Sequence, residues 1–196
     1  KGPGKGLQPN KRDDLIGLMA QREMKPGDFF YPMDLGKGIV IPKSYKFKRP
    51  WGLPVRYHDF DILRKKSNMG FLEFHMSYKD MDQDVESFFS EVYDLDFAVH
   101  SPDLFSGDHL LNLAEKDESY RKRSVAELQR VIEITRQLKP FFKKADQVPL
   151  IVSVGGFSKD RPNSREHRKI LYDRVAKSLS ELDAEGVEIL PQTLPP

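Results

Sequence analysis

From residue 69 onward, short apolar runs alternate with longer amphipathic stretches. Four of the runs have the length of strands, at residues 70–75, 94–100, 148–154 and 187–190. Residues 119–138 and 165–185 carry apolar side chains at helical spacing, with charged side chains on the other face. Strands that alternate with helices are typical of a parallel sheet with helical crossovers. The pattern therefore predicts an α/β fold for residues 69–196, with the strands in sequence order.

The first 68 residues show a different pattern. An apolar run at residues 15–20 is strand-like, and a Pro-Gly pair after it indicates a turn. A second strand-like run, Ile-Val-Ile, occupies residues 39–41. Short runs separated by turns predict a small β-rich domain and a linker over residues 1–68.

The four predicted strands are half the number in an eight-stranded βα barrel. A free half-barrel would leave edge strands and one apolar sheet face open. Our interpretation is therefore a partial TIM-type barrel of about four βα units, within a longer protein. A complete four-stranded α/β domain is the alternative.

The composition is that of a globular, water-soluble domain. Of the 196 residues, 38% are hydrophobic and 32% are charged, and no apolar run approaches the roughly 20 residues that span a bilayer. The chain has no cysteine, which excludes disulfides, thiolate metal sites and cysteine nucleophiles. We expect no membrane partner and, by default, a location in the reducing cytoplasm.

The net charge of +2 conceals a contrast between the two regions. Residues 1–68 carry 15 Lys/Arg and 7 Asp/Glu, whereas residues 69–196 carry 17 and 23. Opposite signs favour contact between the regions, and an anionic ligand of the first region is the alternative. Basic residues are not gathered in a patch with aromatic residues between them, which argues against nucleic acid as a partner.

Three short stretches of the first region carry a family resemblance. Residues 20–28 read Ala-Gln-Arg-Glu-Met-Lys-Pro-Gly-Asp, residues 33–35 read Met-Asp-Leu, and residues 48–52 read Lys-Arg-Pro-Trp-Gly. They resemble the antifreeze-like, or SAF, domain of bacterial sialic acid synthases, in which an arginine reaches the sugar in a neighbouring subunit's barrel. The resemblance implies a homo-oligomer and assigns sugar binding to Arg49. A solvated surface arginine is the alternative reading.

A second resemblance lies in residues 99–138. A strand-end histidine, His100, precedes Asn-Leu-Ala at residues 112–114 and a helix that starts Asp-Glu-Ser-Tyr-Arg-Lys-Arg-Ser at residues 117–124. These features resemble the xylose-isomerase-like barrels, which include sugar isomerases, sugar epimerases and endonuclease IV. The resemblance implies a βα barrel over residues 69–196 and a sugar or sugar phosphate as the ligand.

The metal-dependent members of that superfamily have a second histidine after the third strand and a glutamate on the fourth. This chain has Val154 at the first position and Leu-Pro-Gln at the second, residues 190–192. Two expected ligands are therefore absent, and no metal ligand is assigned. A divalent metal held by Glu73, His75 and His100 with residues outside this chain stays open, so the cofactor is unknown.

Four residues are candidates for acid/base chemistry. Glu73 and His75 alternate on the first predicted strand, so their side chains point to the same face. If that face is the barrel interior, they join His100 at one rim, where an imidazole titrates near neutral pH. A buried polar pair that fixes the strand is the alternative. Because His100 is followed by Ser-Pro-Asp, we expect Asp103 to orient its imidazole.

Further candidates bind the substrate. The backbone amides of Gly155 and Gly156 and the ammonium group of Lys159 suit a phosphate or a sugar hydroxyl. The alternative is that the glycines serve only the turn. Gln192, just beyond the fourth predicted strand, is expected on the same rim as His100.

Together the two resemblances imply a sugar-processing protein of bacterial surface polysaccharide (sialic or nonulosonic acid) biosynthesis, with an isomerase- or epimerase-like barrel module. A non-catalytic sugar-binding or domain-docking module is the alternative from another class. An endonuclease IV-like DNA repair enzyme is a poorer alternative, because two metal ligands are missing and residues 69–196 are acidic.

Overall fold

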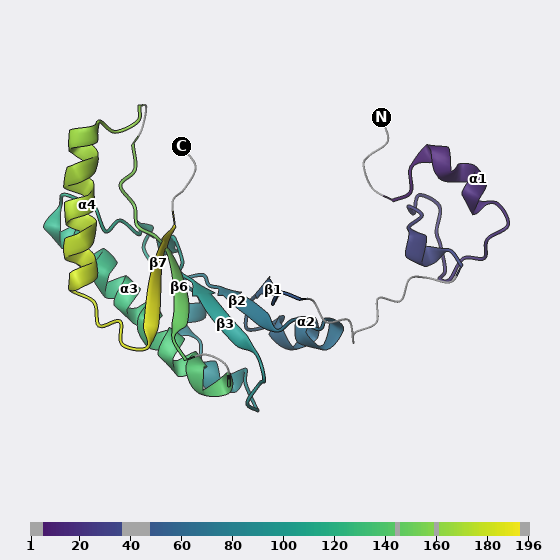
Figure 1. Ribbon diagram of the computed structural model, residues 1–196, viewed down its shortest axis with the longest axis horizontal. Coiled ribbons are helices and arrows are strands. Elements are labelled where there is room, and N and C mark those ends of the chain that lie inside the picture. Colours follow the sequence, from purple (N-terminus) through teal and green to yellow (C-terminus); the bar gives the residue numbers. More distant parts are fainter. Residues whose placement is uncertain (1–5, 37–47, 144–145, 159–160, 193–196) are drawn as a thin grey trace. The chain divides into compact units, whose positions relative to one another are not determined.

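The computed structural model describes four stretches of the chain, residues 6–36, 48–143, 146–158 and 161–192 (Figure 1). Contacts between residues divide the chain into two compact units, residues 1–45 and residues 46–196. In the described part of the chain, no helix has the length and apolar character needed to cross a bilayer.

The second unit is built on a sheet of five parallel strands. These are β1 (Gly52–Val55), β2 (Phe71–His75), β3 (Asp96–His100), β6 (Val148–Ser153) and β7 (Val187–Gln192). They lie side by side in the order of the sequence, and every neighbouring pair is parallel. The predicted α/β class with a parallel sheet is confirmed, and the four predicted strands are present as β2, β3, β6 and β7.

Helices and short helical turns connect the strands. They are α2 (Phe60–Lys66), η3 (Asp80–Asp82), η4 (Val85–Ser87), α3 (Glu118–Leu138), η5 (Lys139–Phe141) and α4 (Arg165–Ser180). Helix α3 begins where the side chain of Asp117 accepts hydrogen bonds from the first backbone amides, and it ends before Pro140. Helices α3 and α4 lie side by side on one side of the sheet (Figure 1).

A small hairpin lies between β3 and α3. Its strands, β4 (Leu104–Phe105) and β5 (His109–Leu110), are antiparallel. The turn between them contains Gly107 and Asp108 at φ of 68° and 55°, a left-handed conformation that glycine and aspartate tolerate better than other residues. The hairpin was not predicted.

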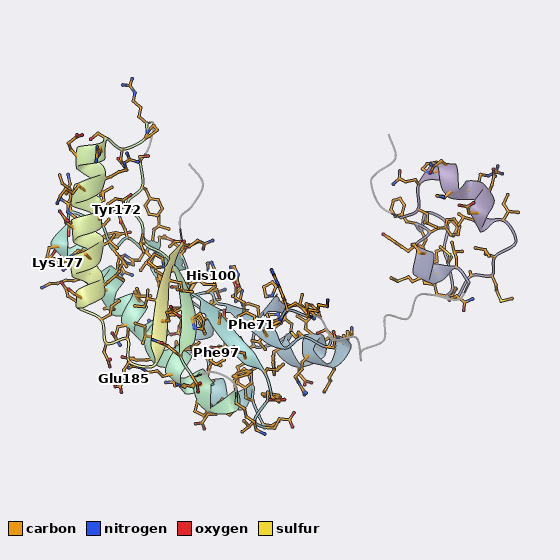
Figure 2. The ribbon with its side chains drawn as sticks, in the orientation of Figure 1. Phe71, Phe97, His100, Tyr172, Lys177 and Glu185 are labelled. Carbon is orange, nitrogen blue, oxygen red and sulfur yellow. The ribbon has the colours of Figure 1, made fainter. Side chains whose placement is uncertain are left out.

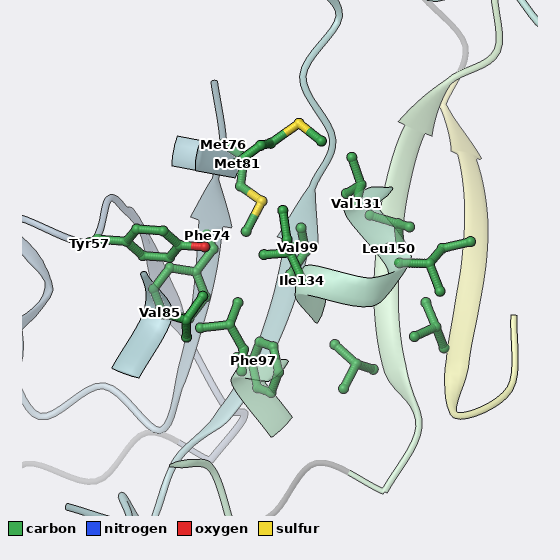
Figure 3. Packing of buried hydrophobic residues seen from close by; sticks show 14 of the residues in the cluster. Tyr57, Phe74, Met76, Met81, Val85, Phe97, Val99, Val131, Ile134 and Leu150 are labelled. Atoms are coloured by element: carbon green, nitrogen blue, oxygen red, sulfur yellow. The ribbon is translucent and has the colours of Figure 1, made fainter. Parts of the chain in front are cut away.

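The core of the second unit lies on one face of the sheet. Leu72 and Phe74 of β2 are at most 1% exposed, because alternate residues of a strand share a face. Apolar residues of α2, α3 and α4 pack in the same cluster, and Figure 3 shows part of it, with Val99 of β3 and Ile134 of α3. The connecting helices therefore cover the same face of the sheet.

The intervening strand residues form the opposite face, which we name the open face. It includes Phe71, Glu73, His75, Ala98, His100, Ile151, Ser153, Leu190 and Gln192. Apolar residues on this face are mixed with ionisable and amide groups. Both histidines and Gln192 lie at the carboxyl ends of their strands, whereas Asp96 and Glu188 share the face near the amino ends of β3 and β7. The open face therefore differs in chemistry from the apolar core face.

Helix α4 is held to α3 largely by polar contacts. The buried residue of α4 is Ser178, whose Oγ donates to the carbonyl of Leu113 at 2.7 Å. Arg121 of α3 is 1% exposed and donates to Ser178 Oγ at 2.9 Å and to Glu181 at 2.7 Å. A buried guanidinium thus connects α3 with α4 and with the residue just beyond it.

Strand β1 changes the predicted domain boundary. The first region was predicted to end at residue 68, yet β1 pairs with β2 and α2 packs in the core, so both belong to the second unit. Gly52 and Pro54 argue against a strand in sequence, but both suit this one. A Cβ at Gly52 would lie 2.3 Å from the carbonyl oxygen of Phe71, and Pro54 is exposed on an edge strand, where proline is tolerated.

The new boundary also weakens the charge contrast. Residues 1–45 carry eight Lys/Arg and five Asp/Glu, and residues 46–196 carry 24 and 25. The basic excess of the first region came mainly from residues 46–68, which belong to the second unit. Opposite net charge therefore no longer favours contact between the two regions.

The first unit is not β-rich within residues 6–36. It contains η1 (Pro9–Lys11), α1 (Arg12–Leu15) and η2 (Pro32–Asp34), and strand pairing there is limited to a bridge between Ala20 and Leu35. The predicted strand at residues 15–20 is instead the end of α1 and a turn, in which Leu18 donates to the carbonyl of Leu15. The other predicted strand, residues 39–41, lies outside the described residues.

Candidate functional site

The carboxyl ends of the parallel strands bring several polar residues to one edge of the sheet. Strands β2, β3, β6 and β7 end at His75, His100, Ser153 and Gln192. Because the strands are parallel, these ends meet at the same edge. This is the edge where α/β sheets and βα barrels bind their ligands.

Two histidines lie against each other at this edge. His75 and His100 are register partners on β2 and β3, and their rings stack with centroids 4.4 Å apart and planes 7° apart. Nδ1 of His75 lies 3.5 Å from Oε1 of Glu73. Three of the four predicted catalytic residues are therefore neighbours on the open face.

His100, labelled in Figure 2, is the last residue of β3, and both of its ring nitrogens have partners. Nδ1 lies 3.1 Å from the carbonyl oxygen of Ser101, and Nε2 lies 2.9 Å from Oε1 of Gln192. The ring tautomer and the orientation of the Gln192 amide together decide which atom donates in each contact. A ring protonated on Nδ1 donates to the Ser101 carbonyl, and its Nε2 then accepts from the NH₂ group of a rotated Gln192 amide.

The contact between His100 and Gln192 joins strands that are not neighbours. Strand β6 lies between β3 and β7 in the sheet, so the two side chains meet above β6. Ile151 of β6 is the register partner of His100, and Ser153 is the register partner of Gln192. The hydrogen bond therefore passes over the end of β6.

Asp103 does not have the predicted role. It is exposed, and its backbone carbonyl accepts from the amide of Leu111 in the hairpin segment. The partners of the His100 ring are the Ser101 carbonyl and Gln192 instead. The chain turns away after Pro102, so sequence proximity does not bring the Asp103 carboxylate to the imidazole.

The glycines after β6 have a structural explanation. Gly155 and Gly156 have φ of 84° and 79°, and a Cβ at Gly155 would lie 2.2 Å from Oδ1 of Asn112. The amide of Gly156 donates to the same Oδ1 at 3.0 Å. The Gly156 amide that was expected to bind a phosphate or a sugar is therefore used within the protein.

The three remaining predicted binding residues differ in position. Arg49 is exposed and precedes the amino end of β1, whereas the two histidines lie at carboxyl ends. Lys159 lies outside the described residues. Of the predicted ligand-binding residues, Gln192 is the one in contact with a predicted catalytic residue.

The structure adds an arginine that the sequence analysis missed. Arg56 follows β1 and donates to Ser77 Oγ at 2.8 Å and to the carboxylate of Asp80. Burial raises the pKa of the adjacent Tyr57 above its ordinary range, and the charge of Asp80 adds to this. Arg56 stands at a strand end like the histidines, but its strand was not predicted.

Ser153 is a second residue that the sequence analysis did not single out. It is 3% exposed, and within the described part of the chain its buried Oγ has no hydrogen-bond partner. Strand alternation places it on the open face, one same-face position after Ile151. Its position at the end of a predicted strand was the available signal.

His109 has a structural role outside this site. It is 2% exposed in β5, and its Nε2 lies 2.9 Å from Oγ of Ser124. Burial lowers its pKa from the ordinary value, and the charge of Arg123 contributes in the same direction. It joins the hairpin to α3.

Among the described residues, no three His, Asp or Glu side chains are grouped so that they could hold a metal ion.

Comparison of the chain with models of protein families, with curated proteins and with solved structures finds no match.

Proposed function

We propose that the open face binds a sugar and that its carboxyl edge isomerises or epimerises it. The observation that carries the proposal is the stacked pair His75 and His100, with Glu73 beside one ring and Gln192 beside the other. Acid/base groups are thereby concentrated at the edge where α/β sheets act on their ligands.

The reaction needs two groups that this site supplies. A base must remove the proton on the carbon next to a carbonyl, and an acid must hydrogen-bond to the carbonyl oxygen as negative charge develops there. His75, supported by Glu73, suits the base. His100, whose Nδ1 proton is held by the Ser101 carbonyl, suits the group that binds the oxygen through Nε2.

The sheet topology supports a barrel of the sugar-isomerase type. Sequential parallel order with the helices on one face is the arrangement of a βα barrel, whereas a doubly wound sheet reverses its order and has helices on both faces. We accordingly propose a partial TIM-type barrel that acts in cytoplasmic nonulosonic acid biosynthesis as a homo-oligomer. The SAF-like stretches support that setting, since residues 20 and 35 of two of them pair in the first unit.

The test is exchange of a carbon-bound proton. The protein is incubated in D₂O with aldoses, ketoses and their phosphates, and deuterium uptake next to the carbonyl is followed by NMR. We expect uptake with at least one sugar, and a loss of about a hundredfold or more in His100→Gln, the usual scale for a missing acid/base group. His167→Gln, on the exposed surface of α4, is the control and should retain full exchange.

One result would contradict the enzymatic proposal, and another would contradict the role of His100 alone. Sugar binding without exchange in the wild type would assign a non-catalytic sugar-binding module. Full exchange by a destabilised His100→Gln would make His100 a structural residue.

A further inference from the structure

The buried hydroxyl of Ser153 has no hydrogen-bond partner among the residues that the structure describes. An unsatisfied buried hydroxyl is unfavourable, and most buried polar atoms in proteins are hydrogen-bonded. Ser153 is 3% exposed and lies on the open face at the end of β6. A hydroxyl kept in this state at the edge that holds the two histidines indicates a use in ligand binding.

The hydrogen bond between Gln192 and His100 lies above the same strand end. Gln192 is the register partner of Ser153, and its side chain reaches across β6 to Nε2 of His100. Gln192 is exposed, so its side chain can rotate into solvent without breaking the core. Such a rotation frees Nε2 of His100 for another partner.

We propose that Ser153 is a substrate-binding residue and that the ligand carries two neighbouring oxygens, as an α-hydroxycarbonyl does. The first oxygen takes the place of Gln192 at Nε2 of His100, and the second hydrogen-bonds to Ser153 Oγ. This inference rests on the proposed function and specifies which part of the sugar is recognised.

The positions of the two groups suit such a ligand. Ile151 is the register partner of His100, and Ser153 is the next residue of β6 on the same face. His100 and Ser153 therefore lie on neighbouring strands, one same-face position apart. A ligand with one oxygen would satisfy His100 and leave Ser153 unpaired.

Substitution of Ser153 and substitution of Gln192 should change the affinity for the ligand in opposite directions. Ser153→Ala removes a bond to the ligand and should weaken binding. Gln192→Ala removes a group that the ligand must displace and should strengthen binding, since affinity is reduced by the fraction of molecules in which the site is occupied internally.

The test uses D-ribose and D-glucose, each with its 2-deoxy counterpart. The 2-deoxy sugars lack the hydroxyl group on the carbon next to the carbonyl carbon. Binding is followed through the imidazole NMR signals of His100. We expect the wild type to bind the parent sugars at least tenfold more tightly than the deoxy sugars. Ser153→Ala should lose that preference while still binding the deoxy sugars, and Gln192→Ala should bind the parent sugars severalfold more tightly.

A matched serine separates binding from folding. Ser124 is also buried, but its Oγ is bonded to His109 and to the amide of Asn112, so Ser124→Ala should lower the Tm. Ser153→Ala removes an unsatisfied group, so its Tm should be unchanged or higher. A fall in Tm equal to that of Ser124→Ala would make Ser153 structural and overturn the inference.

The outcomes distinguish this inference from the proposed function. Parent sugars that shift the His100 signals while Ser153→Ala keeps the full preference would overturn the inference and leave the proposed function intact. Sugars that leave the His100 signals of the wild type unmoved would overturn both.

Discussion

At the scale of single residues, two glycines with left-handed backbone show how geometry selects residue type. Gly155 has φ of 84°, and an added Cβ would lie 2.7 Å from the backbone Cα of Asn112. Gly186 has φ of 74°, but an added Cβ would find its nearest neighbour, Nζ of Lys139, at 3.7 Å. The first glycine avoids both strain and a clash, and the second avoids strain alone.

We therefore expect Gly155→Ala to lower the free energy of unfolding by about 3 kcal/mol, because left-handed strain and overpacking add. Gly186→Ala should lower it by about 1 to 2 kcal/mol, the strain alone. Urea unfolding of both variants measures the difference. Equal losses would show that the segment around Asn112 moves away from the added Cβ without a cost in stability.

Part of the site could be predicted from the sequence at this scale. His100 was found because an apolar run ends on it, and His75 with Glu73 because they alternate on one strand. The partner of His100 was wrongly taken to be Asp103, three residues away, because the true partner, Gln192, depends on side chains that meet across β6. Such a contact depends on the curvature and register of the sheet, which a single sequence does not display.

At the scale of elements, the docking of α4 onto α3 depends on a buried guanidinium. Arg121 is bonded to Glu118 of its own helix, and beyond α4 to Glu181. Its own side chain is 1% exposed, whereas those of its carboxylate partners are 50% and 35% exposed. The carboxylates can therefore regain water when the arginine is removed, but the buried contact between helices is lost.

Replacement of Arg121 by alanine should lower the free energy of unfolding by about 2 to 3 kcal/mol, somewhat less than for a fully buried ion pair. The control is Arg130→Ala, which breaks ion pairs of a half-exposed arginine on the same helix and should cost less than about 1 kcal/mol. Thermal unfolding compares them. Similar losses would show that burial of Arg121 adds nothing to its contacts.

Stability should also depend on pH through Glu118. Hydrogen bonds from Arg121 and then Lys177 lower the pKa of Glu118 from 4.5 to about 2. The unfolded state therefore binds more protons in this range, so the contribution is fully present above pH 4.5 and is lost as the pH falls toward 2. Urea midpoints should fall less steeply with acid in Glu118→Gln than in the wild type. Parallel acid profiles would contradict the linkage.

The elements themselves were predictable to different degrees. Strands β2, β3, β6 and β7 are apolar runs, and α3 has a clear helical period with an N-terminal aspartate. Strand β1 was missed because Gly52 and Pro54 read as breakers, although close packing on β2 and an edge position explain both. The hairpin β4–β5 is too short to produce an alternating pattern.

At the scale of the whole molecule, β1 and α2 decide where the second unit begins. They contribute Val55 and Phe60 to the core, each 1% exposed. The boundary taken from the sequence, after residue 68, would remove both. The fold class was predictable from alternation, whereas the boundary was not, because the missing strand lay in a stretch with turn-like composition.

Two fragments test the boundary. Residues 46–196 should unfold cooperatively with a Tm close to that of the full chain, because contacts group them in one unit. Residues 69–196 lack β1 and α2, so they should expose the core edge around Phe74, bind a hydrophobic dye and lose cooperative unfolding. Equal stability of the two fragments, measured by thermal unfolding, would show that β1 and α2 are dispensable.

The sequential order of the sheet has a consequence for biosynthesis. Each strand of the five-stranded sheet pairs with the strand that precedes it in this sheet along the chain. A growing chain can therefore extend the sheet at one edge as it leaves the ribosome. In a doubly wound sheet, by contrast, later strands must add on both sides of the first. Among the described strands of this sheet, β7 is translated after β6 and pairs with it, so its addition requires no earlier strand pair to separate.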